Sequence, residues 1–441
     1  METISSSIVA TIILYFVTLA LYRLYLHPLS RFPGPKLAAV ARLYESYYDL
    51  YQSGQYTFKI AELHKQYSKE ELVPREGVWR KYDWSVDAFV TKGATLWTAD
   101  HMLHKNRRQP LSPFFSKVKV SNQQDMIMRH VQALFDRLSG FAASQKTVDL
   151  GAAVTAFVRD VVNEYIFGKH YNDLEKEDFD AGMVAATQAG GLMWRITKFV
   201  RFFGPFMRSI PLRWIMAVSD PVMKVFFCFM IISMNDTKNF IKAAVSPDDD
   251  GPRTLAHEIM QSKLPLSEKL RAELSAAPNQ DWKTLEQLPY WTATIMEAMR
   301  LAPAIDTRSA RIAQDKDLIY ANWRIPACTP VGMTLTPAPS EQDRIPRAQA
   351  LEPRLLHGSQ PMAARQLDSK TFVPFGKGKR NCIGMHLVWA EIYLLFGNLV
   401  QRFEFEFPKT KVEDFYVTKD NFALITPCMG VVPALVTQVM I

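Results

Sequence analysis

The sequence has few cysteines, and their positions do not suggest a disulfide framework. Its 441 residues include only four, and these are widely scattered, at Cys228, Cys328, Cys382 and Cys428. It also has no linker, internal repeat or low-complexity tract that would divide it, although a chain of this length leaves room for two or three domains. We therefore expect one large body rather than a disulfide-stapled scaffold or a series of modules.

The chain has no strong excess of charge of either sign. It contains 52 lysines and arginines and 44 acidic residues, which gives a modest net charge of +8. No basic stripe interleaved with aromatic residues is present. We therefore expect no nucleic-acid partner. With 48% hydrophobic and 22% charged residues, the composition is that of an ordinary globular protein with an ample core.

Near the N-terminus, charge is absent from the nineteen residues between Ile4 and Tyr22, which are rich in Ile, Leu, Val and Phe. At a rise of about 1.5 Å per residue, such a helix is about as long as a bilayer core is thick. A cleaved signal peptide is not expected, because the basic segment before the apolar run and the small-residue cleavage site are missing. The segment therefore predicts a membrane anchor.

The charges around this anchor predict its orientation. Glu2 is the only charged side chain before it, whereas Arg23 and Arg31 follow it, so the positive-inside bias places the body in the cytosol. A stiff hinge comes next, made of Pro28, Pro33, Gly34 and Pro35. We expect residues 1–26 to form the anchor and residues 27–441 the body.

The most informative stretch is a glycine-framed cysteine in the run from Phe375 to Gly384, FGKGKRNCIG. The glycines allow tight turns and a close approach to a flat ligand. Three basic residues crowd positive charge around the sulfur of Cys382, which favours a thiolate. An apolar helix is expected over 385–400, so the sulfur would lie just before a helix N-terminus, where the dipole also favours an anion. Such a thiolate suits the proximal side of a haem iron.

Two other kinds of site could use this run of residues. A phosphate-binding loop would need four residues between its glycines and then Lys-Ser or Lys-Thr, and that spacing is missing. Cys382 and His386 lie four apart and could form half of a zinc site, but no second Cys/His pair at a suitable spacing completes it. Haem ligation is the favoured interpretation.

The run meets every specified position of the pattern F-G-x-G-x-R-x-C-x-G, and it resembles the haem-binding loop of the cytochrome P450 family. The resemblance implies a mainly α fold with a small β-sheet region. It also implies that Cys382 is the axial ligand of the iron in haem b, with the cofactor contacted by the loop residues Phe375, Gly376, Arg380 and Gly384. In microsomal members, an N-terminal transmembrane helix tethers the enzyme to the endoplasmic reticulum, with a single span and the catalytic body on the cytosolic side.

A second polar group that fits this resemblance is the pair His104 and Arg108. These residues lie four apart in a dense polar patch, so on a helix they share a face and could bind a carboxylate or phosphate. In the family, the matching helix binds a haem propionate. By the same resemblance, Arg311 is expected to supply a further propionate contact and is preferred over Arg308.

A third group is the Glu-x-x-Arg pair, Glu297 and Arg300. Three apart on a helix, the two side chains can pair. In the family such a pair is buried and joined by an arginine from the segment before the cysteine, a position that Arg354 occupies here. These three residues are expected to form a structural network around the cofactor rather than a catalytic group.

Hydrophobic periodicity predicts the elements around these groups. Apolar residues at three-and-four spacing predict helices over 123–140 and 148–167. Short strands are expected over 317–320, 323–326 and 331–334, and period-two alternation predicts a half-buried strand over 403–407. The aromatic and methionine-rich segment 202–232 suits core packing or, taken together, a lipophilic pocket.

The resemblance implies a haem-thiolate monooxygenase. Electrons would come from NADPH through a separate NADPH-cytochrome reductase that docks on the basic proximal face, where Lys377 and Lys379 are candidates. One oxygen atom of O2 would enter a lipophilic small molecule and the other would leave as water. The sequence is most similar to fungal members that act on secondary metabolites, such as the trichodiene oxygenase group, so a terpenoid or polyketide substrate is expected.

The sequence also departs from the family pattern. The oxygen-activating Ala/Gly-Gly-x-Asp/Glu-Thr-Thr/Ser motif is absent upstream of Glu297, and neither acid–threonine pair in this half, at 236–237 and 306–307, is assigned its catalytic role. Shorter departures follow Tyr67 and span 340–356. A second hypothesis is therefore an internally shortened family member that is catalytically impaired or inactive.

Overall fold

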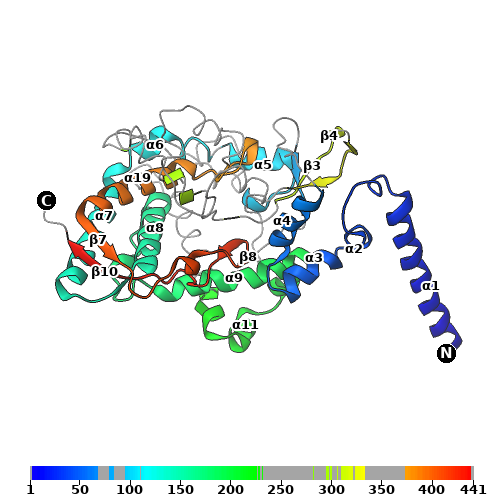
Figure 1. The fold of residues 1–441 in the computed structure, drawn as a ribbon, viewed down its shortest axis with the longest axis horizontal. Coiled ribbons are helices and arrows are strands. Elements are labelled where there is room, and N and C mark those ends of the chain that lie inside the picture. The colour runs from blue at the N-terminus through cyan, green and yellow to red at the C-terminus, as the bar shows by residue number, and fades with distance from the viewer. Residues whose placement is uncertain are drawn as a thin grey trace, which may run out of the picture.

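The structure is a computed structural model that describes residues 2–67, 79–83, 95–109, 111–225, 227–228, 231, 282, 295–296, 298–299, 305, 309–320, 323–332 and 373–438. Over these residues the molecule is mostly helical, with short antiparallel strands (Figure 1). This agrees with the predicted mainly α fold with a small β-sheet region.

Helix α1 (Glu2–Leu21) stands apart from the rest of the molecule in Figure 1. A π-helical turn (Tyr22–Leu26) continues it. Within the described residues, this is the one helix that is long and apolar enough to cross a membrane. Its large apolar side chains face solvent, with Leu14 66% and Phe16 61% exposed. The helix is therefore compatible with the predicted membrane anchor.

The main core lies where four helices pack together. Their buried apolar side chains form one cluster, in which Ile127, Leu134 and Leu138 are each 0% exposed because they share one face of α7. Burying a side chain of this size contributes about 1.5–3 kcal/mol. The four helices are α6 (Lys117–Ser121), α7 (Gln124–Ser144), α8 (Leu150–Phe167) and α19 (Met385–Arg402).

Local signals set the ends of α8. At its N-terminus, the side chain of Asp149 accepts a hydrogen bond from the N–H of Ala152 at 3.1 Å, the usual role of an N-cap aspartate. At its C-terminus, Gly168 adopts φ +63 and donates its N–H to the carbonyl of Glu164 at 2.9 Å. The glycine permits this left-handed turn, which redirects the chain beside the last turn of α8.

A second group of helices links the N-terminal part of the body to α9 (Ala181–Phe199). The ammonium of Lys198 forms ion pairs with Asp49 and, at 3.1 Å, with Glu45, and all three side chains are almost fully buried. The neighbouring elements are α2 (Lys36–Val40), α3 (Leu43–Ser46), a π-helical turn (Tyr47–Tyr51), α4 (Tyr56–Tyr67), α10 (Phe203–Ser209) and α11 (Leu212–Val218). A 3-10 turn (Asp173–Glu175) contacts α7 and α8 instead.

The strands form two three-stranded sheets and two hairpins, all antiparallel where the pairing is described. The first sheet has the order β1 (Trp79–Lys81), β3 (Arg311–Ala313), β6 (Pro330–Val331). The second has the order β2 (Val148–Asp149), β10 (Pro433–Gln438), β7 (Phe403–Glu406). One hairpin pairs β4 (Leu318–Tyr320) with β5 (Trp323–Ile325). The other pairs β8 (Lys419–Asn421) with β9 (Ala423–Ile425) and follows a 3-10 turn (Val412–Phe415).

Most predicted elements are confirmed, with shifted ends. Strands β4, β5 and β7 lie where expected, and in β7 the buried Phe403 alternates with exposed glutamates. Strand β6 starts one residue before the predicted segment 331–334, of which 333–334 lies outside the described residues. Helix α7 runs on to Ser144. The helix expected over 148–167 starts at Leu150, because Val148 and Asp149 pair with β10 instead.

Candidate functional site

The cysteine loop (Phe375–Gly384) contains a 3-10 turn (Gly378–Arg380) and ends where α19 begins. The N–H of Cys382 donates to the carbonyl of Phe375 at 2.8 Å, which closes the loop, while the side chain of Cys382 is exposed. Gly376 and Gly378 adopt φ +69 and +72, the left-handed region that glycine enters without a steric cost. Gly384 is the N-cap of α19, so the sulfur does lie just before a helix N-terminus, as predicted.

An aromatic contact fixes the start of this loop on α19. The rings of Phe375 and Trp389 lie 5.8 Å apart between centroids, and Trp389 in turn stacks on Tyr393 at 5.6 Å. Tyr393 is buried in the main core. The loop therefore has a rigid apolar support on the side of the helix that carries its next residues.

Two arginines tie the cysteine loop to α5 (His101–Arg108). Arg380 donates to the carbonyls of Thr98 at 2.7 Å, Ala99 at 2.9 Å and Asp100 at 3.1 Å, just before α5 begins. From the other end of α5, Arg108 donates to the carbonyl and the side-chain oxygen of Asn381, at 2.6 and 2.7 Å. Cys382 thus directly follows Arg380 and Asn381, which are hydrogen-bonded to the segment before α5 and to the end of α5.

The side chains gathered here are mostly basic, and they depress one another's pKa values. Burial first, and then Arg380 and Arg108, lower the pKa of His104 to about 3. Burial, together with Arg311 and Arg380, lowers the pKa of Lys81 to about 7. Burial and Arg311 lower the pKa of Arg380 to about 10. These directions show a site in which positive charge exceeds negative charge.

Such a cluster fits an anionic ligand beside the sulfur. Within the described part of the chain, the buried Nε of Arg380 has no hydrogen-bond partner. The sulfur of Cys382 lies near enough to Arg108 to favour the charged guanidinium electrostatically. A haem offers two propionates for the cations and an iron for the thiolate, so the donor set of this site fits that cofactor.

The structure brings together most of the predicted site residues. Phe375, Gly376, Arg380, Cys382 and Gly384 form one loop, and the predicted helix carrying His104 and Arg108 is α5, which contacts that loop. Arg311 lies on β3, donates to the carbonyl and hydroxyl of Ser309 at 2.7 and 2.5 Å, and acts electrostatically on Arg380 and Lys81. The other predicted residues, Glu297, Arg300 and Arg354, lie outside the described residues, as does Arg308.

Three groups of contacts were not foreseen from the sequence. The carbonyls of residues 98–100 accept from Arg380, Asn381 accepts from Arg108, and the amine of Lys81 donates to the carbonyl of Leu96 at 3.0 Å. Backbone acceptors leave no signature in the sequence. Asn381 could have been singled out, since it lies between the two residues that define the loop.

An aromatic wall adjoins the basic cluster. The rings of Trp97, Trp194 and Phe422 pack with centroids 4.9–5.4 Å apart, and they come from a 3-10 turn (Thr95–Trp97), from α9 and from the β8–β9 hairpin. The amine of Lys81 lies 4.9 Å from the Trp97 ring centroid, which links this wall to the basic residues. Trp97 and Trp194 are buried, so the wall is a packed aromatic cluster that borders the charged site.

Comparisons with known proteins agree with this geometry. A family model described as Cytochrome P450 matches residues 257–431. A cytochrome P450 monooxygenase of Sordaria araneosa is 30% identical, over 94% of this chain and 95% of that protein. A tryptophan 6-hydroxylase of Fusarium equiseti is 28% identical, over 95% of this chain and 94% of that protein. The crystal structure of a cytochrome P450 superposes with a TM-score of 0.61 at 14% identity, covering 87% of this chain and 98% of that one, which supports the fold alone.

Proposed function

Because this chain belongs to the cytochrome P450 family, whose members are haem b oxidoreductases supplied with electrons from NADPH by a reductase, we propose that it inserts one oxygen atom of O2 into a lipophilic fungal secondary metabolite. The observation that carries the proposal is the exposed Cys382 just before α19, beside a cluster of buried and partly buried cations. A terpenoid or polyketide substrate is the class we expect.

Each residue of the cluster has a proposed role in holding the cofactor. Cys382 would supply the thiolate that binds the haem iron, and Phe375, Gly376 and Gly384 would shape the loop that presents it. Arg108, Arg311 and Arg380 would bind the propionates as cations. His104, whose low pKa keeps it neutral at physiological pH, takes part as a hydrogen-bonding group. When bound, the haem supplies the activation of O2 with electrons from NADPH. The side chains of this chain orient it and exclude water.

One comparison supports an aromatic or otherwise lipophilic substrate. A relative over nearly the whole chain is named for hydroxylation of tryptophan, an aromatic molecule. A substrate screen should therefore include terpenes, polyketides and indole compounds, each scored by the type I shift of the haem spectrum and by the product formed.

The assignment is tested by the reduced carbon-monoxide spectrum of the purified full chain. We expect the Soret band that is characteristic of thiolate-ligated haem, and we expect the Cys382→Ser variant to lose it. Cys428→Ser is the matched control, because Cys428 lies in a different loop, where its sulfur contacts Thr426 at 3.2 Å, and this variant should keep the band. Colourless protein after supply of hemin would contradict the proposal, and so would an unchanged band in Cys382→Ser.

A second candidate function is a haem protein with impaired oxygen activation. The acid–threonine motif is missing from the sequence, and the alignment with the Sordaria araneosa relative extends over 504 positions, more than the 441 residues of this chain. The relative therefore carries internal residues that have no counterpart here. With a reductase and NADPH, an impaired enzyme would consume NADPH and release peroxide without oxidising a substrate that it binds, whereas a competent one would form product.

We place the protein at the endoplasmic reticulum, with residues 1–26 as a single-pass anchor and residues 27–441 as a cytosolic haem domain. The exposed apolar side chains of α1 and the basic residues that follow it support this arrangement. Lys377 and Lys379 are exposed beside the cysteine loop, where a reductase with an acidic surface could dock.

A further inference from the structure

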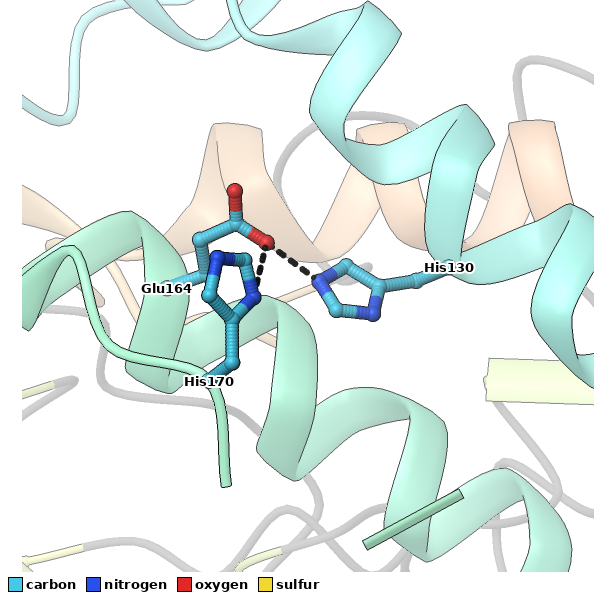
Figure 2. A group of neighbouring side chains, drawn as sticks. All are labelled: His130, Glu164 and His170. Atoms are coloured by element: carbon cyan, nitrogen blue, oxygen red, sulfur yellow. Dashed lines mark hydrogen bonds and ion pairs between the residues drawn. The ribbon is translucent and has the colours of Figure 1, made fainter. Parts of the chain in front are cut away.

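Outside the residues that surround Cys382, two histidines and a glutamate converge on one point (Figure 2). His130 comes from α7, Glu164 from the last turn of α8, and His170 from the segment after Gly168. One oxygen of Glu164, Oε2, lies 2.7 Å from Nε2 of His130 and 3.3 Å from Nδ1 of His170. These three atoms all lie within 4.8 Å of one another.

The donor set is that of a zinc-type site. Two imidazole nitrogens and one carboxylate oxygen, with a fourth position left for water, are a known ligand set for Zn²⁺. Ligand bonds of about 2.0–2.1 Å in a tetrahedron place neighbouring donor atoms roughly 3.3 Å apart. The distance from Oε2 of Glu164 to Nδ1 of His170 already has this value. The distance from Oε2 to Nε2 of His130 is shorter, 2.7 Å, and a small rotation of the His130 ring would lengthen it.

The surroundings prepare the carboxylate as a ligand. Burial alone would raise the pKa of Glu164, but hydrogen bonds and charge from Arg129 and His130 outweigh burial and hold it below its ordinary value. Arg129 binds the other oxygen, Oε1, at 2.6 Å, so Oε2 is left to face the two imidazoles.

The site also has a route of entry and a consequence for the fold. The side chain of His170 is 54% exposed, whereas those of His130 and Glu164 are 12% and 13% exposed, so a cation can reach the donors from the His170 side.

We propose that His130, Glu164 and His170 bind one divalent transition-metal ion of the zinc type, which joins α7, α8 and the turn that follows α8.

The test uses the full chain loaded with haem and freed of any histidine tag. We expect one equivalent of zinc per chain by metal analysis, counted separately from iron, and a rise in the thermal unfolding midpoint with ZnCl2 but not with MgCl2. His170→Ala and Glu164→Gln should each weaken zinc binding by at least about tenfold in calorimetric titration. His27→Ala is the control, because His27 lies in another part of the chain, where its ring accepts the N–H of Leu29.

Arg129→Ala separates a metal site from a simple cluster of ion pairs. The guanidinium of Arg129 is a positive charge next to the bound cation, and its side chain is 61% exposed, so its removal should leave zinc binding unchanged or make it severalfold tighter. Three results would overturn the proposal: no zinc retained by the unaltered chain, equal affinity in His170→Ala, or loss of binding in Arg129→Ala as large as in His170→Ala.

Discussion

At the scale of single residues, the cysteine loop depends on arginines whose partners are oxygens of the protein itself. Arg380 donates to three carbonyls, and Arg108 donates twice to Asn381. Both arginines are partly buried, and burial lowers the pKa of each. They therefore have two tasks, to shape the loop around Cys382 and to keep positive charge available for a cofactor.

Replacing Arg380 should reduce the haem content of the purified protein. In Arg380→Ala, the carbonyls of residues 98–100 lose the guanidinium as a donor, and a hydrogen bond to a charged group contributes about 1.5–3 kcal/mol. We expect a severalfold lower ratio of haem to protein after purification, measured by absorbance. Lys379→Ala is the matched control, because this neighbouring cation is exposed and its removal should leave the ratio unchanged. Equal haem loss in the two variants would contradict the role given to Arg380.

Glu391 predicts a pH dependence of stability. This residue of α19 is 5% exposed, burial raises its pKa from 4.5 to about 8, and its Oε1 has no hydrogen-bond partner in the part of the chain that the structure describes. Between pH 4.5 and 8, the unfolded chain releases this proton while the folded chain keeps it, so stability contributed by this group falls as pH rises through that window.

Glu391→Gln removes this titration while keeping the shape of the side chain. The variant should gain thermal stability relative to the unaltered protein as the pH is raised from 5 to 8.5, because only the unaltered protein must bury a carboxylate or hold its proton. The thermal unfolding midpoints of both proteins at the two pH values are the measurement. A gap between the midpoints that stays constant with pH would show that Glu391 is not the group responsible.

At the scale of elements, the aromatic wall depends on how closely α9 approaches the β8–β9 hairpin. A Cβ added to Gly191 of α9 would lie 2.4 Å from the Cβ of Asn421, which precedes Phe422 at the tip of the hairpin. Only glycine permits this approach, since no other residue lacks a Cβ. The position of Phe422 against Trp194 and Trp97 therefore rests on one glycine.

Gly191→Ala should shift the hairpin and change the wall. Overpacking of this kind costs about 1–3 kcal/mol, and we expect a lower unfolding midpoint. Gly182→Ala, in the same helix, is the matched control, because its added Cβ would meet no atom within 4 Å. It should be neutral or slightly stabilising, since alanine favours helix more than glycine does. Similar losses in both variants would mean that helix propensity, and not the contact with the hairpin, is responsible.

The sequence predicted elements and contiguous sites better than contacts between distant segments. The cysteine loop is one continuous stretch of sequence, and α7 and α8 each follow a local apolar period, so the sequence predicts the loop and both helices. Strand β2 was missed because Val148 and Asp149 pair with β10, nearly three hundred residues later. The cluster of His130, Glu164 and His170 was missed for a similar reason, since its members come from separate elements.

At the scale of the whole molecule, α1 stands apart from the body and presents apolar side chains to its surroundings. Residues of the body, by contrast, are joined by buried contacts such as those of Lys198 with Glu45 and Asp49. The two parts therefore differ in kind: the exposed apolar side chains of α1 are compatible with a bilayer, whereas the body buries a core of its own.

Deleting residues 2–26 should release the protein from membranes without preventing haem binding. We expect most of the shortened chain in the soluble fraction after ultracentrifugation, with a carbon-monoxide spectrum like that of the full chain, because no described core residue lies in α1. Loss of the spectrum would show that the anchor is needed for folding. A chain that remains fully membrane-bound would instead point to a second attachment surface on the body.

The tie between Arg380 and the segment before α5 has a consequence for how such a sequence can diverge. Its acceptors at residues 98–100 are main-chain oxygens, which every amino acid supplies. A substitution at any of the three positions therefore leaves these acceptors in place. Thr98 and Asp100 also use their side chains, Thr98 to accept from Arg107 and Asp100 to cap α5, so Ala99 is the position that can change most freely without loosening the loop around the sulfur.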